Sequence, residues 1–286
     1  MKFFINGRFV QEKDARISVN DLGIIRGYGV FDFLRTYNKT PFLLKEHLNR
    51  FFYSAKKANI KVPFNRKEIR EIIAKLIKKN SKLAEEFTFR IVLTGGKPQG
   101  SRLSVNPNFF ILCQKPHIYD KELYLKGAAL RVLNYCRQFP EIKSLNYFFA
   151  VSQWEKIEKA RAVEALYVYK NKIYECSSSN FFIVKKNRIY TPKEEILGGV
   201  TRNLVVRLIK SKLRKFSVIE KSLFFKEALT ADEAFITSTE KEIMPIVSID
   251  GIKIGRGVPG GVVKEIIKEF NKYTASYGRE KKKNGG

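Results

Sequence analysis

The sequence is poor in the residues that build metal centres and disulfide frameworks. Among 286 residues there are three cysteines, Cys113, Cys136 and Cys176, and two histidines, His47 and His117. No CxxC pair or metal-ligand spacing joins them, so neither a zinc site nor a triad with a histidine base is expected. Thiols scattered singly are typical of proteins from reducing compartments.

Long hydrophobic runs are also missing. No stretch approaches the roughly 20 apolar residues that a membrane-spanning helix needs. The N-terminus reaches the turn-forming pair Asn6-Gly7 before any signal-peptide apolar region develops. The 44% hydrophobic residues, with 23 Phe and 13 Tyr, can fill a sizeable core. We therefore expect a cytoplasmic globular protein with no membrane partner and about two domains.

Acidic residues are outnumbered: 28 Asp and Glu stand against 55 Lys and Arg, for a formal net charge of +27. Basic chains can bind nucleic acid by sequence-independent electrostatics. Here, however, the basic residues are spread along polar faces of helical patterns such as Lys75–Lys79. We expect a solvated basic surface and no nucleic-acid partner, with a basic nucleic-acid-binding protein as the alternative from another class.

The first 115 residues alternate strand and helix signals and are predicted to form a small N-terminal α/β domain. Residues 116–126, with Pro116, lack periodicity and are the predicted interdomain linker. The expected elements are a hairpin around Asn6-Gly7, helices over 44–58 and from the N-cap Asn65 through Leu76, strands Phe87–Leu93 and Phe109–Cys113, and a loop Gly95–Asn108 between those strands.

Residues 127–277 are predicted to form a larger, β-rich domain, and the basic tail 278–286 is predicted to be disordered. The expected elements of the larger domain are a helix over 146–161, a four-strand meander (Ala165–Tyr169, Ile173–Cys176, Phe181–Val184, Ile189–Thr191), a helix after Gly198-Gly199, strands Ala234–Thr237 and Ile243–Ile249, and a final helix Val262–Tyr273.

One lysine and one glutamate stand in unusual company. Lys143 lies among apolar residues next to a helix start, where desolvation would lower its pKa and make it a nucleophile. A surface charge is the alternative in so lysine-rich a chain. Glu175 ends a strand and is followed by Ser177-Ser178-Ser179-Asn180. This segment is either an ordinary turn with an exposed acid, or it presents the acid and hydroxyls to a polar ligand.

Two further segments could bind an anion. Gly198-Gly199 frees the backbone, and Thr201 stands where an N-cap is expected ahead of an amphipathic helix. Exposed amides and the helix dipole make such a terminus a phosphate site, unless it is simply a capped helix. Thr237-Ser238-Thr239 follows an apolar strand, where hydroxyls can bind anions or merely end the strand.

These segments together match, in order and spacing, the class IV aminotransferases. This family uses pyridoxal 5′-phosphate and includes D-amino-acid transaminases, branched-chain aminotransferases and aminodeoxychorismate lyase. The resemblance runs from about Asn20 to Lys264. It is carried by the motifs Arg26–Phe31, Glu46–Arg50, Ile142–Asn146, Glu175–Asn180, Gly199–Arg202 and Ser238–Pro245.

The resemblance implies a two-domain α/β (α+β) fold type IV homodimer with the cofactor between the domains. It implies that Lys143 carries the cofactor as a Schiff base and moves the substrate proton, and that Glu175 pairs with the pyridine nitrogen. Arg50, the amides of Val200 and Thr201, and two threonine hydroxyls would hold the phosphate. The full implied cofactor-binding set is Arg50, Arg137, Tyr147, Glu175, Ser178, Ser179, Asn180, Gly199, Val200, Thr201, Ser238 and Thr239. Either Tyr147 or Arg137 would contact the ring 3′-oxygen, and His47 would be structural.

The substrate end departs from the usual patterns. The usual D-amino-acid transaminase has Tyr at the position of Phe31 and an Arg-x-His pair where this chain has Thr94–Lys97. The branched-chain Phe-Glu-Gly pattern is not met by Phe31-Asp32-Phe33. The chain is similar to less usual D-amino-acid transaminases, in which two arginines, here Arg26 and Arg90, bind the substrate carboxylate. A solvent-facing Arg90 is the alternative.

The expected reaction is ping-pong transfer of an amino group from an amino acid, a D-amino acid as first choice, to a 2-oxo acid such as 2-oxoglutarate. A branched-chain L-amino-acid aminotransferase is the nearest alternative, and a lyase of the aminodeoxychorismate type is the second.

Overall fold

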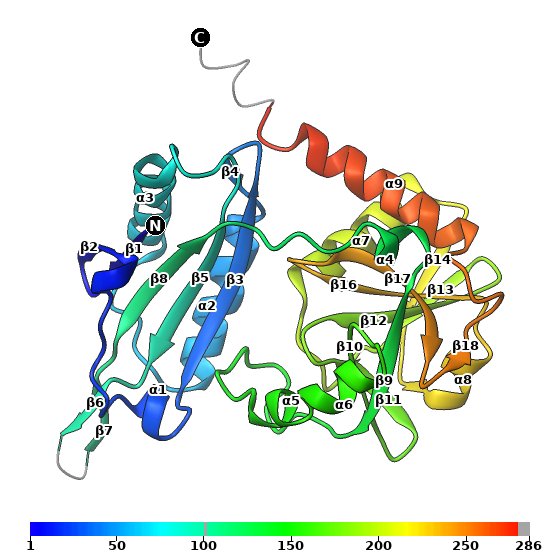
Figure 1. Cartoon of the computed structure of the whole chain (residues 1–286), viewed down its shortest axis with the longest axis horizontal. Helices are drawn as coiled ribbons and strands as arrows, with labels where there is room; N and C mark the ends of the chain where they lie inside the picture. Colours follow the sequence, from blue (N-terminus) through cyan, green and yellow to red (C-terminus); the bar gives the residue numbers. More distant parts are fainter. Residues whose placement is uncertain (100–101, 280–286) are drawn as a thin grey trace. The chain divides into compact units, whose positions relative to one another are not determined.

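The computed structural model describes residues 1–99 and 102–279. It divides into two compact units (Figure 1). The N-terminal unit comprises Met1–His117, Ile142–Tyr147 and the segment from Ala275; the C-terminal unit comprises Ile118–Glu141 and Phe148–Thr274. The expected linker contains a short helix, α4 (Glu122–Leu125), which belongs to the C-terminal unit. Residues 280–286 of the predicted disordered tail lie outside the described residues, whereas Gly278 and Arg279 are described.

Residues 142–147 differ from the sequence-based division, which assigned them to the larger domain. They belong to the N-terminal unit because their backbone extends its sheet. The Phe31 amide donates to the Lys143 carbonyl at 2.9 Å and the Leu145 amide to the Gly29 carbonyl at 3.0 Å, around an antiparallel bridge between Val30 and Ser144. This pairing brings the lysine motif to the start of a strand of the N-terminal unit.

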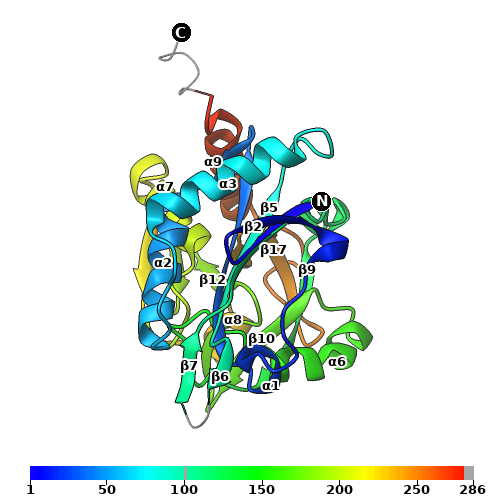
Figure 2. The ribbon, with the colours of Figure 1, turned by 90° about the vertical axis from the view of Figure 1, so that its left-hand side faces the viewer.

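The N-terminal unit is built on a six-stranded sheet in the order β2-β1-β8-β5-β3-β4. Helices α2 and α3 lie on one face of this sheet (Figures 1 and 2). Their apolar residues pack with alternate strand residues into one core that includes Leu48, Phe51 and Ile73. The elements are β1 (Lys2–Ile5), β2 (Arg8–Gln11), α1 (Leu22–Ile25), β3 (Gly29–Tyr37), β4 (Thr40–Pro41), α2 (Leu44–Lys57), α3 (Arg66–Asn80), β5 (Thr88–Thr94) and β8 (Phe109–Gln114), with a 3-10 turn at Glu12–Asp14.

Local sequence signals explain several of these elements. The β1–β2 hairpin is confirmed, with Asn6 and Gly7 at φ 46° and 93°, the left-handed conformations that a tight hairpin turn needs. The N-cap of α3 is confirmed as well: the Asn65 side chain accepts from the Glu68 amide, and the Glu68 carboxylate accepts from the Asn65 amide.

The loop predicted for Gly95–Asn108 instead contains a second hairpin, β6 (Lys97–Gln99) with β7 (Arg102–Asn106). The base of this hairpin is fixed by residues far along the chain. The Thr94 hydroxyl and the Asn108 amide both donate to the buried Asp21 carboxylate, at 2.7 and 2.5 Å, and the Leu22 amide donates to the Gly96 carbonyl. Glycine and proline in this segment are typical of irregular loops, which is why the sequence did not predict the hairpin.

The C-terminal unit is built on a ten-stranded sheet in the order β14-β13-β12-β16-β17-β9-β10-β11-β15, with β18 paired to β17. Its strands are β9 (Ala128–Asn134), β10 (Glu164–Tyr169), β11 (Lys172–Cys176), β12 (Asn180–Lys185), β13 (Arg188–Thr191), β14 (Ser217–Glu220), β15 (Leu223–Phe224), β16 (Glu233–Ser238), β17 (Glu242–Ile249) and β18 (Ile252–Lys253). Its helices besides α4 are α5 (Phe148–Ser152), α6 (Trp154–Lys159), α7 (Val200–Lys212), α8 (Phe225–Leu229) and α9 (Gly261–Ser276), which ends in the N-terminal unit.

The predicted meander is correct in its four strands and wrong in its pairing. β10 pairs with β11 and β12 with β13, but β11 continues to β15 and β12 to β16. The serine turn after Glu175 is hydrogen-bonded by the side chain of Glu164, which draws the chain out of a simple hairpin at this point. The single helix predicted for 146–161 is divided into α5 and α6 at Gln153.

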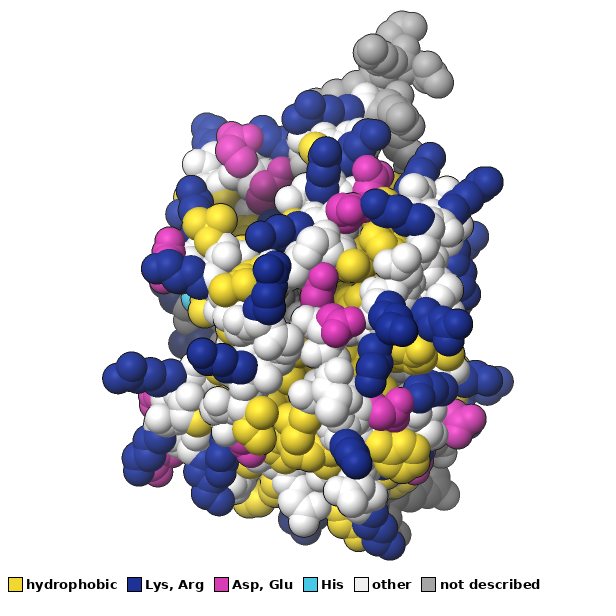
Figure 3. All heavy atoms as spheres, turned by 90° about the vertical axis from the view of Figure 1, so that its right-hand side faces the viewer, with side chains coloured by type: hydrophobic (Ala, Val, Ile, Leu, Met, Phe, Trp, Pro, Cys, Tyr) yellow, Lys and Arg dark blue, Asp and Glu magenta, His cyan; other side chains and the backbone are white. Residues whose placement is uncertain are grey.

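None of the helices in the described part of the chain is long and apolar enough to cross a membrane. On the face in Figure 3, lysine and arginine side chains are dispersed among acidic and apolar ones.

Candidate active site

Lys143 is fixed against the N-terminal unit by its backbone. Its amide donates to the hydroxyl of Ser54 on α2 at 3.1 Å, and its carbonyl accepts from the Phe31 amide. The side chain is only 8% exposed, and its Nζ lies 4.6 Å from the centre of the Phe31 ring. A lysine amine held on an aromatic face and largely shielded from water is suited to covalent chemistry with a carbonyl compound.

The Phe31 ring is the centre of a cluster of predicted site residues. Tyr147 meets it edge to face at 5.7 Å between ring centres. The Arg90 guanidinium carbon lies 5.5 Å from the ring centres of both Phe31 and Phe33. The register of β3 and β5 explains this, because Phe33 stands directly opposite Arg90. The structure thus brings Lys143, Tyr147, Phe31 and Arg90 to one face of the sheet.

The other face of β3 carries a buried charge network. Asp32 is fully buried, with Nδ1 of His47 at 2.7 Å and Nε of Arg50 at 2.8 Å from its carboxylate. Burial raises the pKa of Asp32, but Arg50 and His47 outweigh it, so the net pKa is lowered. Burial also lowers the pKa of His47, against the opposing effect of Asp32. Asp32 therefore fixes the Arg50 guanidinium next to the strand that pairs with Lys143.

Arg26 is not drawn into the Phe31 cluster. It ends α1, is exposed, and donates to the neighbouring Ile25 carbonyl at 3.1 Å. Arg90 stands four residues inside the end of β5, about 13 Å along the strand from Thr94. The described residues include no contact between the two arginines that the sequence paired.

In the C-terminal unit, Glu175 on β11 is 4% exposed and lies at the centre of a polar network. The Arg137 guanidinium donates to its Oε1 at 2.9 Å. The Leu197 amide donates to Oε2 at 3.0 Å, and the Asn180 side-chain amide does so at 3.4 Å. Arg137, predicted as one of two candidates for a ring oxygen, thus contacts the glutamate. A buried carboxylate held ionised in this way can pair with a protonated heterocyclic nitrogen.

Sequence reasoning missed Glu164 and Lys241, which hold the serine turn. Glu164 is 2% exposed and accepts from the Ser179 hydroxyl at 2.8 Å and from the Ser178 amide. The Lys241 ammonium lies 3.2 Å from the same carboxylate and donates to the Ser178 hydroxyl at 3.0 Å. The Lys241 amide is in turn bound by the Ser238 hydroxyl at 3.0 Å. Ser178, Ser179 and Ser238 therefore have protein partners within this buried network.

The N-terminus of α7 begins one residue earlier than predicted. Gly199 is the N-cap and Thr201 lies inside the first turn, with its side chain 5% exposed. A side chain at Gly199 would collide with Oδ1 of Asn180, only 1.9 Å from an ideal Cβ, so the helix can begin there only with glycine. The first amides of α7 and the Thr201 side chain thus gather near Asn180. Such a terminus attracts phosphate.

The end of β16 adds two hydroxyl residues to this region. Thr237 stands directly opposite Asn180 in the sheet, and Thr239 follows in the turn to β17. The Thr237 hydroxyl is buried and has no hydrogen-bond partner in the described part of the chain. Sequence reasoning singled out this turn but not Thr237, whose strand position suggested a packing role.

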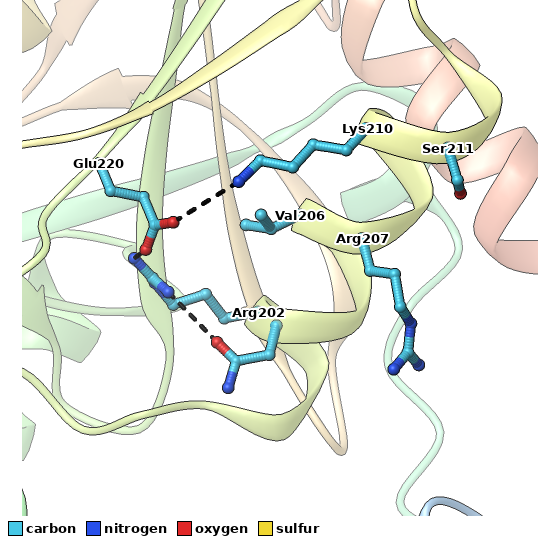
Figure 4. Close-up of a pocket in the computed structure, with 7 residues that line it drawn as sticks. Arg202, Val206, Arg207, Lys210, Ser211 and Glu220 are labelled. Atoms are coloured by element: carbon cyan, nitrogen blue, oxygen red, sulfur yellow. Dashed lines mark hydrogen bonds and ion pairs between the residues drawn. The ribbon is translucent and has the colours of Figure 1, made fainter.

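A hollow of about 460 Å³ lies along α7 beside Glu220 (Figure 4). Its charged side chains pair with one another: Arg202 donates to Glu220 at 2.8 Å, with Lys210 at 4.0 Å from the same carboxylate. Arg207 points away from this pair. None of the predicted site residues lines the hollow. Within residues 1–99 and 102–279, no group of three or more His, Cys, Asp or Glu residues could hold a metal ion.

Comparison with known proteins is consistent across sequence and structure. The family model "Amino-transferase class IV" matches residues 29–249. A Methanocaldococcus jannaschii protein assigned as a branched-chain-amino-acid aminotransferase is 32% identical, over 97% of this chain and 98% of its own length. The D-alanine aminotransferase of Bacillus licheniformis is 32% identical, over 93% and 94% respectively. The crystal structure of a branched-chain amino acid aminotransferase from T.th. with pyridoxamine 5′-phosphate has a TM-score of 0.88 at 26% identity, covering 98% of this chain and 95% of that one.

The side-chain chemistry described above fits pyridoxal 5′-phosphate. A shielded lysine amine suits its aldehyde, a buried carboxylate suits its pyridine nitrogen, and a glycine-initiated helix with a threonine in its first turn suits its phosphate. The chain belongs to the class IV aminotransferases, and it is a pyridoxal-phosphate-dependent transaminase with that family's two-domain α/β fold.

Proposed function

We propose that this transaminase takes its amino group from D-amino acids and that Arg90 binds the substrate α-carboxylate. The observation that carries the proposal is the position of Arg90. Its guanidinium lies over Phe31 and Phe33, on the ring that also contacts Lys143, and no carboxylate in the described residues pairs with it. A planar guanidinium stacked on aromatic rings keeps its charge and can bind a carboxylate with two hydrogen bonds.

Lys143 acts on the reacting carbon. Bound pyridoxal phosphate supplies the electron sink that makes the substrate α-hydrogen acidic. The Lys143 amine then removes the proton from one carbon and returns it to another. The backbone anchors to Ser54 and Phe31 hold the lysine while its side chain moves, and burial limits proton exchange with water.

The remaining predicted residues position the cofactor in this proposal. Glu175 accepts the hydrogen bond of the protonated pyridine nitrogen, with Arg137 and Asn180 keeping the carboxylate ionised and fixed. The α7 amides of Val200 and Thr201, the Thr201 and Thr239 hydroxyls and Arg50 bind the phosphate. Tyr147, which packs on Phe31, is the remaining candidate for the ring oxygen. Ser178, Ser179 and Ser238 support this surface through Glu164 and Lys241.

Arg26 is the second proposed carboxylate ligand. It is exposed, and it is tethered to the Phe31 side of the sheet because α1 is hydrogen-bonded to Thr94 and Gly96 through Asp21 and Leu22. Its side chain would have to turn from the Ile25 carbonyl toward Arg90 when substrate binds.

A branched-chain L-amino-acid aminotransferase is the second candidate. The relative from Methanocaldococcus jannaschii, matched over 97% of this chain, favours it. Against it stands Asp32-Phe33 in place of Glu-Gly on β3, where Asp32 is committed to His47 and Arg50.

Single-turnover reactions with paired D- and L-amino acids test the choice. Loss of the cofactor's visible absorbance on mixing with D-alanine or D-glutamate, faster than with either L-isomer, is the expected result. Faster conversion with L-leucine or L-valine would reject the D-amino-acid proposal and leave the transaminase assignment intact.

We also propose that two copies associate. Phe148, Val151 and Trp154 on α5 and α6 expose large apolar surfaces that a second copy could cover. Sedimentation equilibrium should give twice the 33.1 kDa mass of the chain. A single-chain mass at micromolar concentration would contradict this proposal.

A further inference from the structure

Thr237 on β16 is an exception among the buried threonines. Its side chain is 1% exposed, and its hydroxyl oxygen has no hydrogen-bond partner in the described part of the chain. By contrast, the hydroxyl of Thr191 donates to the Phe181 carbonyl at 2.9 Å and that of Thr94 to the Asp21 carboxylate at 2.7 Å. An unpaired buried hydroxyl destabilises a folded protein unless something that is not part of the chain satisfies it.

The position of Thr237 indicates what that something is. Thr237 stands directly opposite Asn180, so the two side chains leave the sheet on the same face. Their neighbours Ile236 and Phe181 face the apolar core on the other side. The Asn180 side chain donates to the Leu197 carbonyl at 2.9 Å and lies tightly against Gly199, the N-cap of α7. The unpaired hydroxyl is thus beside the first turn of the helix whose amides attract phosphate.

We propose that the Thr237 hydroxyl is a further ligand of the cofactor phosphate, to which it donates a hydrogen bond next to the α7 amides. The inference rests on the proposed phosphate position at the start of α7. An anion there satisfies the hydroxyl and the free amides of the helix together, which explains why a polar side chain is kept at a core-like strand position. Ser238 is not equivalent, because its hydroxyl already contacts the Lys241 amide at 3.0 Å.

The variant Thr237→Val tests this, because valine keeps the shape of threonine and removes the hydroxyl. Apoprotein is titrated with pyridoxal 5′-phosphate by equilibrium dialysis, and thermal melts are recorded with and without cofactor. We expect the apo variant to melt at or above the wild-type temperature, since an unsatisfied polar group is gone. Its dissociation constant for the cofactor should rise about tenfold or more, as for loss of one hydrogen bond to a charged group. Thr237→Ser should restore affinity.

Two controls separate the possible outcomes. Thr191→Val removes a satisfied hydroxyl, so it should lower the apo melting temperature and leave cofactor affinity unchanged. Pyridoxal without its phosphate should bind wild type and Thr237→Val equally. An unchanged dissociation constant in Thr237→Val, or an equal loss of pyridoxal binding, would overturn the inference. Thr201→Ala shows whether the wider proposal fails with it: if this variant also binds cofactor normally, the phosphate is not at α7, whereas weakened binding in Thr201→Ala alone rejects only Thr237.

Discussion

The amide of Phe31 donates to the carbonyl of Lys143 at 2.9 Å, and the Lys143 ammonium lies 4.6 Å from the centre of the Phe31 ring. One strand residue therefore positions both the backbone and the side chain of the cofactor-binding lysine. Because Phe31 also contacts Arg90 and Tyr147, substrate recognition and proton transfer depend on the same ring. Substitutions around it should affect chemistry more than folding.

Replacing Lys143 by alanine should abolish transamination and the visible absorbance of lysine-bound cofactor. The melting temperature should change little, because the segment is held by backbone hydrogen bonds that alanine retains. Absorbance spectroscopy and thermal melts of the purified variant check this. Lys75→Ala, on the exposed face of α3, is the matched control and should behave as wild type. Retained turnover in the Lys143 variant would move the catalytic role to another lysine.

Glu175→Gln should leave cofactor bound but slow the proton transfer step strongly, because a neutral pyridine is a poorer electron sink. Glutamine keeps the shape and can still accept from Leu197 and Asn180, so stability should fall only moderately. A primary isotope effect with α-deuterated substrate, larger than in wild type, would identify the slowed step. Wild-type turnover would mean that Glu175 has a structural role only.

Lys241→Met should destabilise the C-terminal unit, because it leaves the buried Glu164 carboxylate without its cation. Breaking such a pair costs about 3–5 kcal/mol. Adding Glu164→Gln should recover part of this loss, since an amide can keep the serine hydrogen bonds without a charge. Urea unfolding of both variants measures the coupling. Lys126→Met, which breaks the exposed Lys126–Glu122 pair, should have no measurable effect. Simple additivity of the two core substitutions would show that Glu164 and Lys241 are not coupled.

Stability should fall on the acid side for two reasons. The pKa of His47 is lowered by burial, so protonation favours the unfolded chain as pH falls below about 6.5. Burial alone would raise the pKa values of Asp32 and Glu164, but their cationic partners lower them. Their contributions are complete above pH of about 4–5, where the unfolded carboxyls ionise, and are lost at lower pH. Unfolding free energies between pH 3 and 8 should show a shallow decline followed by a steep one. A value that rises on acidification would contradict both assignments.

Sequence reasoning succeeded where the decisive residues are close along the chain. Asn6-Gly7 specifies its hairpin, and Asn65 with Glu68 specifies the start of α3, through contacts within three residues. It was also successful for the family, because six ordered motifs are read jointly. It failed for the Glu164–Lys241 network: Lys241 and Ser178 are 63 residues apart, and each charge alone resembles a surface residue.

The start of α7 shows a different limit. Thr201 is a better N-cap than Gly199 by local preference, so the sequence favoured it. The structure instead requires glycine at the cap because Asn180, from β12, occupies the space of a side chain. That packing constraint comes from another strand and leaves no trace in the local pattern. The same holds for residues 142–147, whose place in the N-terminal unit is decided by pairing with β3.

Arg90 gives the sharpest test of the D-amino-acid proposal. Arg90→Ala should lower kcat/KM about tenfold to a hundredfold, because a charge-assisted hydrogen bond to a carboxylate contributes about 1.5–3 kcal/mol. Arg90→Lys should not rescue well, since an ammonium cannot reproduce the planar fork that lies over Phe31 and Phe33. Cofactor affinity should stay within about twofold, because Arg90 belongs to none of the proposed cofactor contacts. Half-reaction rates and cofactor dialysis on the same preparations measure both quantities.

Arg66→Ala is the matched control for this experiment. Arg66 is an exposed arginine of the same unit that also lies over an aromatic ring, 4.2 Å from the centre of Phe52, so its removal reproduces the loss of an arginine–aromatic contact without touching the Phe31 cluster. The control should keep wild-type kinetics. If Arg90→Ala also keeps its rate, Arg90 is a solvent-facing strand residue and the carboxylate is bound elsewhere. If the variant loses cofactor, Arg90 supports the cofactor site, and the D-amino-acid proposal loses the residue on which it depends.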